Sequence, residues 1–185
     1  KFGTGLKNIP SPNRYIWADK RIVPKWKKKI GSQKKPLIGL AWEGNPLHKN
    51  DYNRSILLAE LIPHLPKKYE YIGLQKDIRE SNLKTLKINS IIDNLIDNNV
   101  SMDDTAAIIE NLDIVISVDT SVAHLSASMG KPTWILLPFV PDWRWLLNRN
   151  DSPWYKSVKL FRQEKRGNWE LVFKDLNKKL NVLYQ

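Results

Sequence analysis

After Pro36 the chain alternates short apolar runs with segments of helical pattern, and this alternation constrains the fold more than any other feature. The strand-like runs are "LIGLAW" (37–42), "YEYIGLQ" (69–75), "DIVISV" (113–118), "TWILLP" (133–138) and "VKLFRQ" (158–163). Nearly continuous apolar strands separated by helices are typical of a parallel sheet that is buried on both faces. The sequence therefore predicts an α/β domain with right-handed crossovers between its strands.

Helical patterns fill most of the segments between these runs. We expect helices at 55–65, 101–112, 120–130 and 168–180, and a short one at 23–30. Ser101 or Asp103 is suited to cap the helix at 101–112, and Gly130 to close the helix at 120–130. The stretch from 76 to about 100 follows neither pattern clearly.

The positive charge of the chain is concentrated in its first 35 residues. The formal net charge is +11, and residues 1–35 carry eleven Lys or Arg against the single acid Asp19. The remaining residues carry nineteen basic and eighteen acidic groups, so the body of the chain is nearly neutral. A domain that binds nucleic acid is expected to carry its basic stripe on the folded body. We therefore expect residues 1–35 to form a solvated connector. The second interpretation is a dock for an acidic partner or a missing domain, and the third is contact with nucleic acid or a membrane surface.

Composition excludes several classes of protein. The 185 residues contain no cysteine, which excludes disulfides and thiolate metal sites. The three histidines are not spaced as a ligand set and no Asp-x-Asp pair occurs, so we expect no metal and no cofactor. No apolar run approaches the roughly 20 residues of a membrane helix, and no signal peptide is recognisable. We expect a cytoplasmic location, and a longer parent protein because the chain begins with Lys1.

A short polar sequence follows the clearest strand of the chain. Asp119, Thr120 and Ser121 come directly after the run at 113–118, and His124 lies three residues further on. In an open parallel sheet, ligands bind beyond the carboxyl ends of the strands, where the first amides of the next helix favour phosphate. Thr120 and Ser121 would cap this helix and add hydroxyl donors, while His124 faces the same ligand one turn later. In the alternative interpretation, Asp119 or Thr120 only caps the helix and His124 packs against a neighbour.

A second polar loop, "WEGNPLHKNDYNRSI" (42–56), follows the first strand. Gly44 and Asn45 begin a turn, and Arg54 lies just before the next helix. This loop leaves the same edge of the sheet, so Arg54 would neutralise a diphosphate in bidentate fashion. Gln75, at the tip of the run at 69–75, would read a base or ribose edge. In the alternative interpretations, the loop at 42–56 is only a long polar surface loop, and the tip at Gln75 is only a plain turn.

Several segments together resemble a known group of enzymes. The segments "IGLAWEGNPLHKNDYNRSI", "YIGLQKD", "DDTAAIIENLDIVISVDTSVAHLSASMGKPTWILLPFVPDWRWLLNRNDSPWY" and "VKLFRQ" resemble the C-terminal half of bacterial tetratricopeptide-repeat glycosyltransferases. These are similar to heptosyltransferases of glycosyltransferase family 9 and, more distantly, to O-linked N-acetylglucosamine transferase. The resemblance implies a GT-B fold of two Rossmann-like domains. Residues 36–185 would form the second, nucleotide-sugar-binding domain, and residues 1–35 the basic connector from a missing N-terminal domain.

The resemblance also implies roles for the residues after the strand at 113–118. Asp119 would lie near the sugar hydroxyls, and Thr120, Ser121 and His124 would contact the diphosphate at the start of the helix. Many heptosyltransferases have glycine where this chain has Ser121. A serine at this position can still bind phosphate, but the difference leaves the identity of the sugar donor undefined.

The other half of the implied site comes from the first two loops. Arg54 would meet the leaving phosphate, Gly44 and Asn45 would approach it, and Gln75 would lie near the nucleoside. The resemblance places the catalytic base in the missing acceptor-side domain, so no residue of this chain is assigned that role.

The implied reaction transfers a sugar from a nucleoside diphosphate to an acceptor, which is a glycan or a protein. We expect a UDP-, ADP- or GDP-linked donor, metal-independent chemistry and inversion at the anomeric carbon. This chain alone would be inactive without the upstream acceptor domain.

Two rival functions are considered. A dehydrogenase needs G-x-G-x-x-G after a strand, and neither this pattern nor a P-loop occurs. A non-catalytic module that docks a nucleotide or a protein on the same fold remains the alternative. Binding of a nucleoside diphosphate and turnover with the upstream half discriminate the enzyme from this module.

Overall fold

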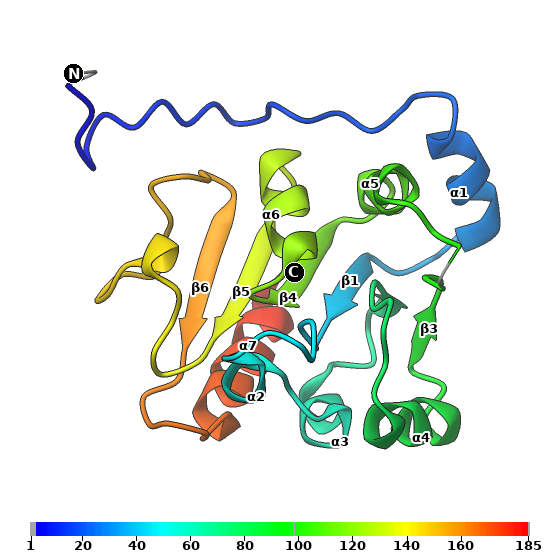
Figure 1. Cartoon of the computed structure of the whole chain (residues 1–185). Coiled ribbons are helices and arrows are strands. Elements are labelled where there is room, and N and C mark those ends of the chain that lie inside the picture. Colours follow the sequence, from blue (N-terminus) through cyan, green and yellow to red (C-terminus); the bar gives the residue numbers. More distant parts are fainter. Residues whose placement is uncertain (1–2, 98, 185) are drawn as a thin grey trace.

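The fold is a six-stranded parallel sheet with helices on both faces (Figure 1). The structure, a computed structural model, describes residues 3–97 and 99–184. Residues 1–2 of the predicted connector and residue 185 of the predicted domain lie outside these ranges. The strands are β1 (Leu37–Ala41), β2 (Glu70–Gly73), β3 (Ile92–Asn94), β4 (Ile114–Val118), β5 (Thr133–Leu137) and β6 (Val158–Arg162).

The strand order is β3-β2-β1-β4-β5-β6, and all neighbouring pairs are parallel. Ile38 in β1 pairs with Tyr71 in β2 on one side and with Ile114 in β4 on the other. The chain therefore builds the sheet outward from β1 in one direction and then from β4 in the other. Loops after β1 and β4 diverge at this reversal, which is the point where open α/β sheets bind ligands.

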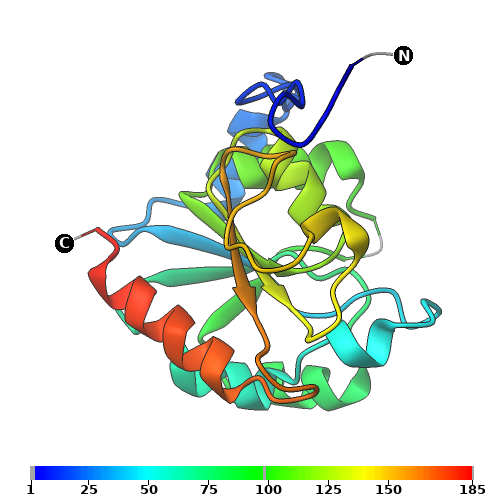
Figure 2. The ribbon, with the colours of Figure 1, turned by 90° about the vertical axis from the view of Figure 1, so that its left-hand side faces the viewer.

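The helices cover the two faces in separate groups (Figures 1 and 2). They are α1 (Val23–Ile30), α2 (Asp51–Arg54), α3 (Leu58–Leu61), α4 (Glu80–Ile88), α5 (Met102–Glu110), α6 (Ser121–Ser128) and α7 (Glu170–Val182), with 3-10 turns at Ile62–His64 and Trp143–Trp145. One face packs against α3, α4 and α7, and the other against α1, α5 and α6. None of these helices, within the described residues, is long and apolar enough to cross a membrane.

The central strands are apolar because both of their faces are covered. In β4, Ile114 and Ile116 pack on the side of α7, whereas Val115 packs on the side of α5. Side chains alternate between faces along a strand, so a strand covered on both sides needs apolar residues at successive positions. Each fully buried Ile or Val contributes about 1.5–3 kcal/mol relative to exposure. This burial fixes the register and, with it, the edge at which the loops emerge.

The helix expected at 55–65 is shorter than predicted. Residue Ile56 is extended next to β1, with its N–H donating to the Trp42 carbonyl at 2.8 Å. The α-helix begins at Leu58, whose N–H is taken by the Asn82 side chain, and gives way to a 3-10 turn that contains Pro63. Proline has no N–H for the helical ladder, and this explains the early end.

The unclear stretch before residue 100 contains the helix α4 and the edge strand β3. In α4, only Asn82 is buried, so the helix has no apolar stripe that a periodic pattern would reveal. Strand β3 is three residues long and follows as "IDN". The structure of both elements depends on their contacts with the rest of the domain more than on a local sequence pattern.

The leading segment is mostly exposed, and it also contacts the body of the chain at a few points. It runs along the ends of α6 and α5 before α1 (Figure 1), and the N–H groups of Tyr15 and Ile16 both donate to the Ser128 carbonyl. Arg14 pairs with Glu110 at 2.7 Å. These contacts attach the segment to the ends of α5 and α6.

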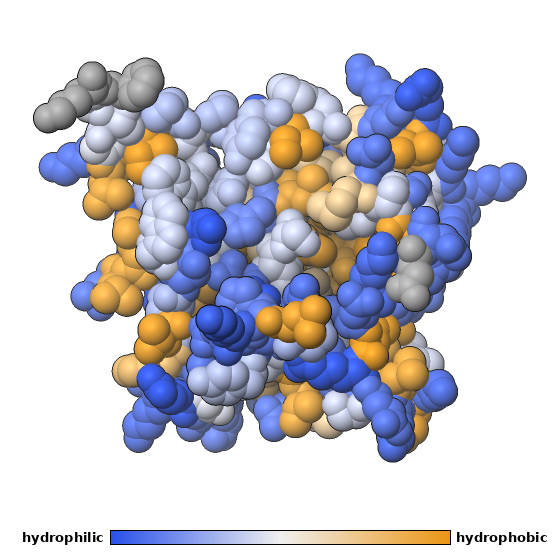
Figure 3. Space-filling model, viewed as in Figure 1, coloured by the Kyte–Doolittle hydropathy of each residue, from blue (hydrophilic) through white to orange (hydrophobic). Residues whose placement is uncertain are grey.

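Helix α1 is the short helix predicted at 23–30, and it carries Trp26 and Ile30 on its inner side. The Trp26 indole donates to Asp104 at 2.9 Å, and Ile30 is buried against α5. The lysines of its last turn remain exposed, and the corner of the molecule occupied by α1 is mostly hydrophilic (Figure 3).

Replacing Gly130 by alanine should destabilise the protein more than the same change at Gly167. Both glycines have positive φ, at 70° and 73°, so each alanine carries the left-handed penalty of about 1–2 kcal/mol. A Cβ at residue 130 would also lie 2.5 Å from the Asn13 carbonyl oxygen, whereas one at residue 167 meets nothing within 4 Å. We expect a further loss of about 1 kcal/mol or more at Gly130 in urea unfolding. Equal losses would show that the leading segment does not pack here in solution.

Candidate functional site

A cavity of about 850 Å³ opens at the carboxyl edge of the sheet. Its walls come from the loops after β1, β2, β4 and β5 and from the first turns of α5 and α6. The eight residues predicted from the sequence all line it: Gly44, Asn45, Arg54, Gln75, Asp119, Thr120, Ser121 and His124. Loops that are far apart in the sequence thus converge on one hollow, as the parallel topology requires.

The first turn of α6 faces this cavity. Thr120 is the N-cap residue in extended conformation, with φ −139° and ψ 173°, and Ser121 is the first helical residue. The predicted capping bond is not formed, because the Thr120 hydroxyl lies 3.1 Å from the Ser117 hydroxyl instead. The first amides of α6 are therefore not occupied by a side-chain cap, and they carry the positive end of the helix dipole.

Asp119 and His124 contact each other at the mouth of α6. The His124 Nε2 atom lies 3.5 Å from Asp119 Oδ1, and its Nδ1 atom lies 2.9 Å from the Tyr155 hydroxyl. The imidazole also stacks on Trp145, with ring centroids 5.1 Å apart. The ring of His124 thus packs against neighbours and also lines the cavity.

Tyr155 sets the orientation of the His124 ring. Burial raises the pKa of Tyr155 to about 12, with a further contribution from Tyr15, so the phenol keeps its proton at neutral pH. The contact at Nδ1 directs the Nε2 side of the His124 ring toward Asp119. Trp145 is fully buried, and Tyr155 lines the cavity.

The carboxyl group of Asp119 is more acidic than usual. Burial raises its pKa, but the polar contacts of His124 and Trp145, followed by the charges of His124 and Arg54, lower the pKa further, to below its ordinary 3.8. The buried indole N–H of Trp145 has no partner of standard hydrogen-bond geometry among the described residues. Its influence on Asp119 is therefore that of a nearby dipole, and the carboxylate is ionised at neutral pH.

The ionised Asp119 should stabilise the fold in a pH-dependent way. Because its folded pKa is below the unfolded value, this stability is present above the unfolded pKa and is lost as pH falls through the folded pKa. Wild type should exceed Asp119→Asn in unfolding free energy at neutral pH, and the gap should narrow toward about pH 2. Urea unfolding across this range checks it. A gap that does not change with pH would contradict the assignment.

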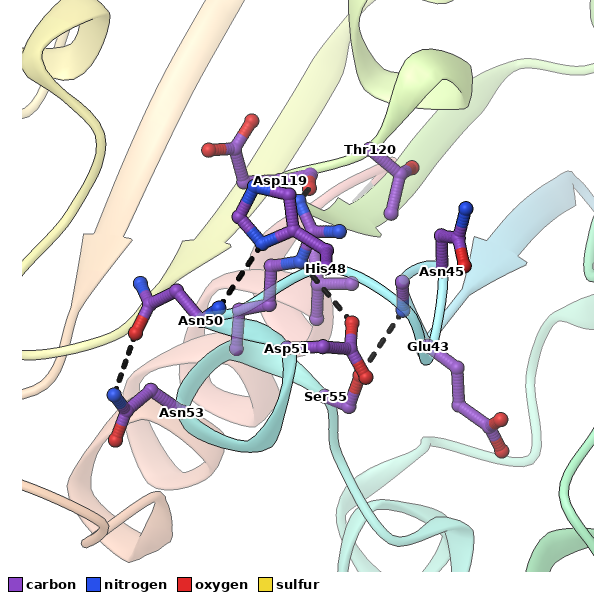
Figure 4. A network of polar contacts seen from close by, with 12 residues as sticks. Glu43, Asn45, His48, Asn50, Asp51, Asn53, Ser55, Asp119 and Thr120 are labelled. Carbon is purple, nitrogen blue, oxygen red and sulfur yellow. Dashed lines mark hydrogen bonds and ion pairs between the residues drawn. The ribbon is translucent and has the colours of Figure 1, made fainter.

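Arg54 joins the loop after β1 to the loop after β4. Its Nη1 atom donates to the Asp119 carbonyl at 2.7 Å, and its Nε atom to Asp51 Oδ1 at 3.2 Å. The two acceptor residues, Asp51 and Asp119, are labelled in Figure 4. The side chain is only 14% exposed. Within the described residues its Nη2 atom makes no hydrogen bond, although Arg54 lines the cavity. A guanidinium group thus lies beside the first turn of α6 with donor capacity remaining.

Other predicted residues are used mainly within the protein. The Gly44 N–H donates to the Ser55 hydroxyl, and the Asn45 side chain accepts from the N–H of Leu47 at 2.9 Å. The Gln75 side chain accepts from two N–H groups of the β1 loop and donates to the Asp77 carbonyl. These contacts brace the loops. Gln75 in particular is buried, and its amide holds the loops after β1 and β2 together.

Sequence reasoning missed a network of charged and polar side chains that joins the loop after β1 to the start of α4. It consists of Glu43, Asp51, Arg79 and Asn82, of which all but Arg79 are buried. Arg79 and Asn82 lie in the stretch that showed no clear pattern, so no signal tied them to the site. Separately, the described residues contain no cluster of three or more His, Cys, Asp or Glu side chains suited to hold a metal ion.

The comparisons with known proteins concern the fold. No family model matches the sequence. Protein FlbA of Caulobacter vibrioides is 27% identical over 171 residues, which cover 88% of this chain and 28% of FlbA. The ADP-heptose LPS heptosyltransferase II of E. coli superposes with a TM-score of 0.62 at 14% identity, covering 96% of this chain and 56% of that chain.

The chain thus spans little more than half of the heptosyltransferase and less than a third of FlbA. At these identities the structural likeness carries the fold alone. It confirms the predicted α/β class: this chain is a Rossmann-like parallel sheet flanked by helices, as found in a GT-B glycosyltransferase.

Proposed function

We propose that this chain is the donor-binding half of a glycosyltransferase, which holds a nucleoside diphosphate sugar in the cavity at the carboxyl edge of the sheet. One observation carries the proposal most directly. Arg54 donates to the Asp119 carbonyl at 2.7 Å, which puts a guanidinium group against the residue that precedes α6. A cation and a helix N-terminus therefore meet on one cavity, and both favour a diphosphate.

The chemistry follows from the charge that develops in the reaction. When the bond between sugar and diphosphate breaks, negative charge accumulates on the departing phosphate oxygens. The α6 amides, the hydroxyls of Thr120 and Ser121 and the Arg54 guanidinium would stabilise that charge from fixed positions. Such an arrangement needs no metal, and we propose metal-independent transfer with inversion at the anomeric carbon.

Asp119 and His124 would act on the sugar side of the diphosphate. An ionised carboxylate at the rim of the cavity accepts hydrogen bonds from sugar hydroxyls, and His124 holds that carboxylate in place. Neither is proposed as the base that activates the acceptor. That group would come from an upstream domain, in keeping with the 56% of the heptosyltransferase that this chain covers.

The cavity is large enough for the rest of the donor. Its volume of about 850 Å³ lies within the range of small-molecule sites, roughly 300–1,000 Å³. The end toward β2 and α5 is lined by Leu74, Ile96, Val100 and Met102. Apolar walls of this kind suit the flat face of a nucleobase, while the α6 end suits the diphosphate.

We extend the proposal to the parent protein, its donor and its acceptor. On the sequence resemblance, the parent protein would be a cytoplasmic tetratricopeptide-repeat glycosyltransferase, also related to O-linked N-acetylglucosamine transferase. Its donor would be UDP-, ADP- or GDP-linked and its acceptor a glycan or a protein. Residues 1–35 would connect the two domains.

Calorimetry with UDP, ADP and GDP in turn tests the proposal. We expect saturable binding of at least one nucleotide, and sugar transfer once the chain is joined to its upstream half. Binding without transfer would favour the non-catalytic module. Absence of binding for all three nucleotides would remove the basis for a nucleotide-sugar site.

A further inference from the structure

Four charged side chains lie together beneath the loop after β1. Two are carboxylates, Glu43 and Asp51, with only 3% and 2% of their surface exposed. Two are arginines, Arg54 and Arg79, so the formal charges of the group cancel. Burying ions is costly unless each is paired and hydrogen-bonded, so such an arrangement fixes its members in a narrow set of geometries.

Asp51 is held on both of its oxygen atoms. Oδ1 accepts from Arg54 Nε at 3.2 Å, and Oδ2 accepts from the Ser55 hydroxyl at 3.0 Å and from the Arg79 guanidinium group. Ser55 in turn accepts from the Gly44 N–H (Figure 4). The carboxylate therefore lies between two guanidinium groups, of which Arg54 lines the cavity and Arg79 does not.

Arg79 is anchored from the opposite side. Its backbone N–H donates to Glu43 Oε2 at 3.2 Å, and its guanidinium lies 3.8 Å from the same oxygen. The other oxygen of Glu43 accepts from the Trp42 indole and from the Asn82 amide. The position of Asp51 is thereby tied to the end of β1 and to the start of α4.

Gly44 provides the space that Arg54 occupies. A Cβ at residue 44 would lie 2.5 Å from Arg54 Nε and closer still to the Asp51 carboxylate. Real side-chain atoms do not approach so closely, so any residue other than glycine would displace the guanidinium group. The φ angle of Gly44 is not in the left-handed region, and the requirement is one of space alone.

We propose that Asp51 is a positioning residue for Arg54, fixed by Arg79 and given room by Gly44. This inference rests on the proposed diphosphate site. Asp51 takes the Nε–H of Arg54 and the Asp119 carbonyl takes an Nη1–H, and Nη2, which lies against Gly44 in the cavity wall, would donate to the ligand. An arginine held in this way loses less rotamer freedom on binding than a mobile one.

A positioning role for Asp51 and simple electrostatics predict opposite changes in anion affinity when the carboxylate is removed. Removing a buried carboxylate beside an anion site adds one positive charge, which by Coulomb attraction alone would tighten binding of an anion. If Asp51 positions Arg54, its removal must weaken binding instead. The direction of the change therefore separates the two accounts.

Calorimetric titration of this chain with inorganic pyrophosphate measures that direction. We expect Asp51→Asn to weaken pyrophosphate binding by about tenfold. Asp151→Asn is the matched control, because Asp151 is an exposed carboxylate that pairs with Arg149 at 2.6 Å and its loss changes the charge equally. The control should bind as wild type does, or slightly tighter. Unchanged or tighter binding by Asp51→Asn would overturn the proposal.

Gly44→Ala tests the same geometry without changing any charge. It should weaken pyrophosphate binding, and its result decides the case if Asp51→Asn does not fold. Asp51→Asn and Gly44→Ala should each weaken pyrophosphate binding little further in a protein that already carries Arg54→Ala. A merely structural role predicts instead that each change costs the same affinity with and without Arg54. If Gly44→Ala binds as wild type does, or if the losses add fully, the positioning role is wrong.

Different results would contradict the proposed diphosphate site and the positioning role of Asp51. If Arg54→Ala itself leaves pyrophosphate binding unchanged, the proposed diphosphate site is wrong. If Arg54→Ala weakens binding but Asp51→Asn and Gly44→Ala do not, the site stands and only the positioning role falls.

Discussion

Asp119→Ala and His124→Ala are each expected to lower sugar transfer by the complete protein at least about tenfold, or roughly 1.4 kcal/mol of barrier. The two side chains form one unit, with His124 Nε2 3.5 Å from Asp119 Oδ1 at the mouth of α6. Loss of the carboxylate removes the acceptor for sugar hydroxyls, and loss of the imidazole releases the carboxylate. Because both act on the same feature, the double variant should lose less than the sum of the single losses.

Steady-state transfer rates measure this effect. His124 stacks on Trp145 and contacts Tyr155, so the rates must be compared at a temperature where circular dichroism shows each variant to be folded. Asp175→Ala, an exposed carboxylate on α7, is the control and should keep wild-type turnover. Wild-type turnover in both site variants would show that this pair does not take part in transfer.

Arg54→Ala is expected to weaken binding of a nucleoside diphosphate about tenfold or more. Hydrogen bonds to charged groups are worth about 1.5–3 kcal/mol, and Arg54 presents its remaining donors from a largely buried position. The affinity of wild type should fall as salt rises, and the variant should depend less on salt because one cation is gone.

Calorimetry at two salt concentrations separates this role from general charge. Arg166→Ala removes an equal charge from an exposed position and should change the dissociation constant little. An Arg54→Ala variant with the affinity of wild type would exclude Arg54 from the binding site.

The convergence of the two polar loops was predictable from the sequence. Runs such as the one at 113–118 are nearly continuous in apolar residues, which indicates parallel strands, and parallel strands end at one edge. The loop with Arg54 and the loop with Asp119 each follow such a run, so their proximity follows from topology. The 2.7 Å contact between these two residues agrees with that expectation.

The roles of single side chains were less predictable, because they depend on partners far away in the sequence. Gln75 was expected near a nucleoside, yet its amide is occupied by the loops after β1 and β2. Tyr155 contacts His124 from 31 residues away, and Arg79 reaches Asp51 from an unpatterned stretch. No local spacing encodes such pairings. They arise once the sheet order is set.

The leading segment shows a similar limit. Its charge predicted a solvated connector, and most of its described residues are exposed, but charge does not reveal where the segment contacts the body. Tyr15 and Ile16 bind through backbone N–H groups to Ser128, and backbone groups leave no mark in composition. The short helix at 23–30 was predictable because its apolar side has helical spacing.

The central claim is that the first turn of α6 and the Arg54 guanidinium group bind the same diphosphate. A crystal structure with whichever of UDP, ADP or GDP binds tests it most directly. The account predicts phosphate oxygens within hydrogen-bond distance of both the α6 amides and Arg54. A diphosphate bound elsewhere on the chain, or contacting only one of these two elements, would contradict it.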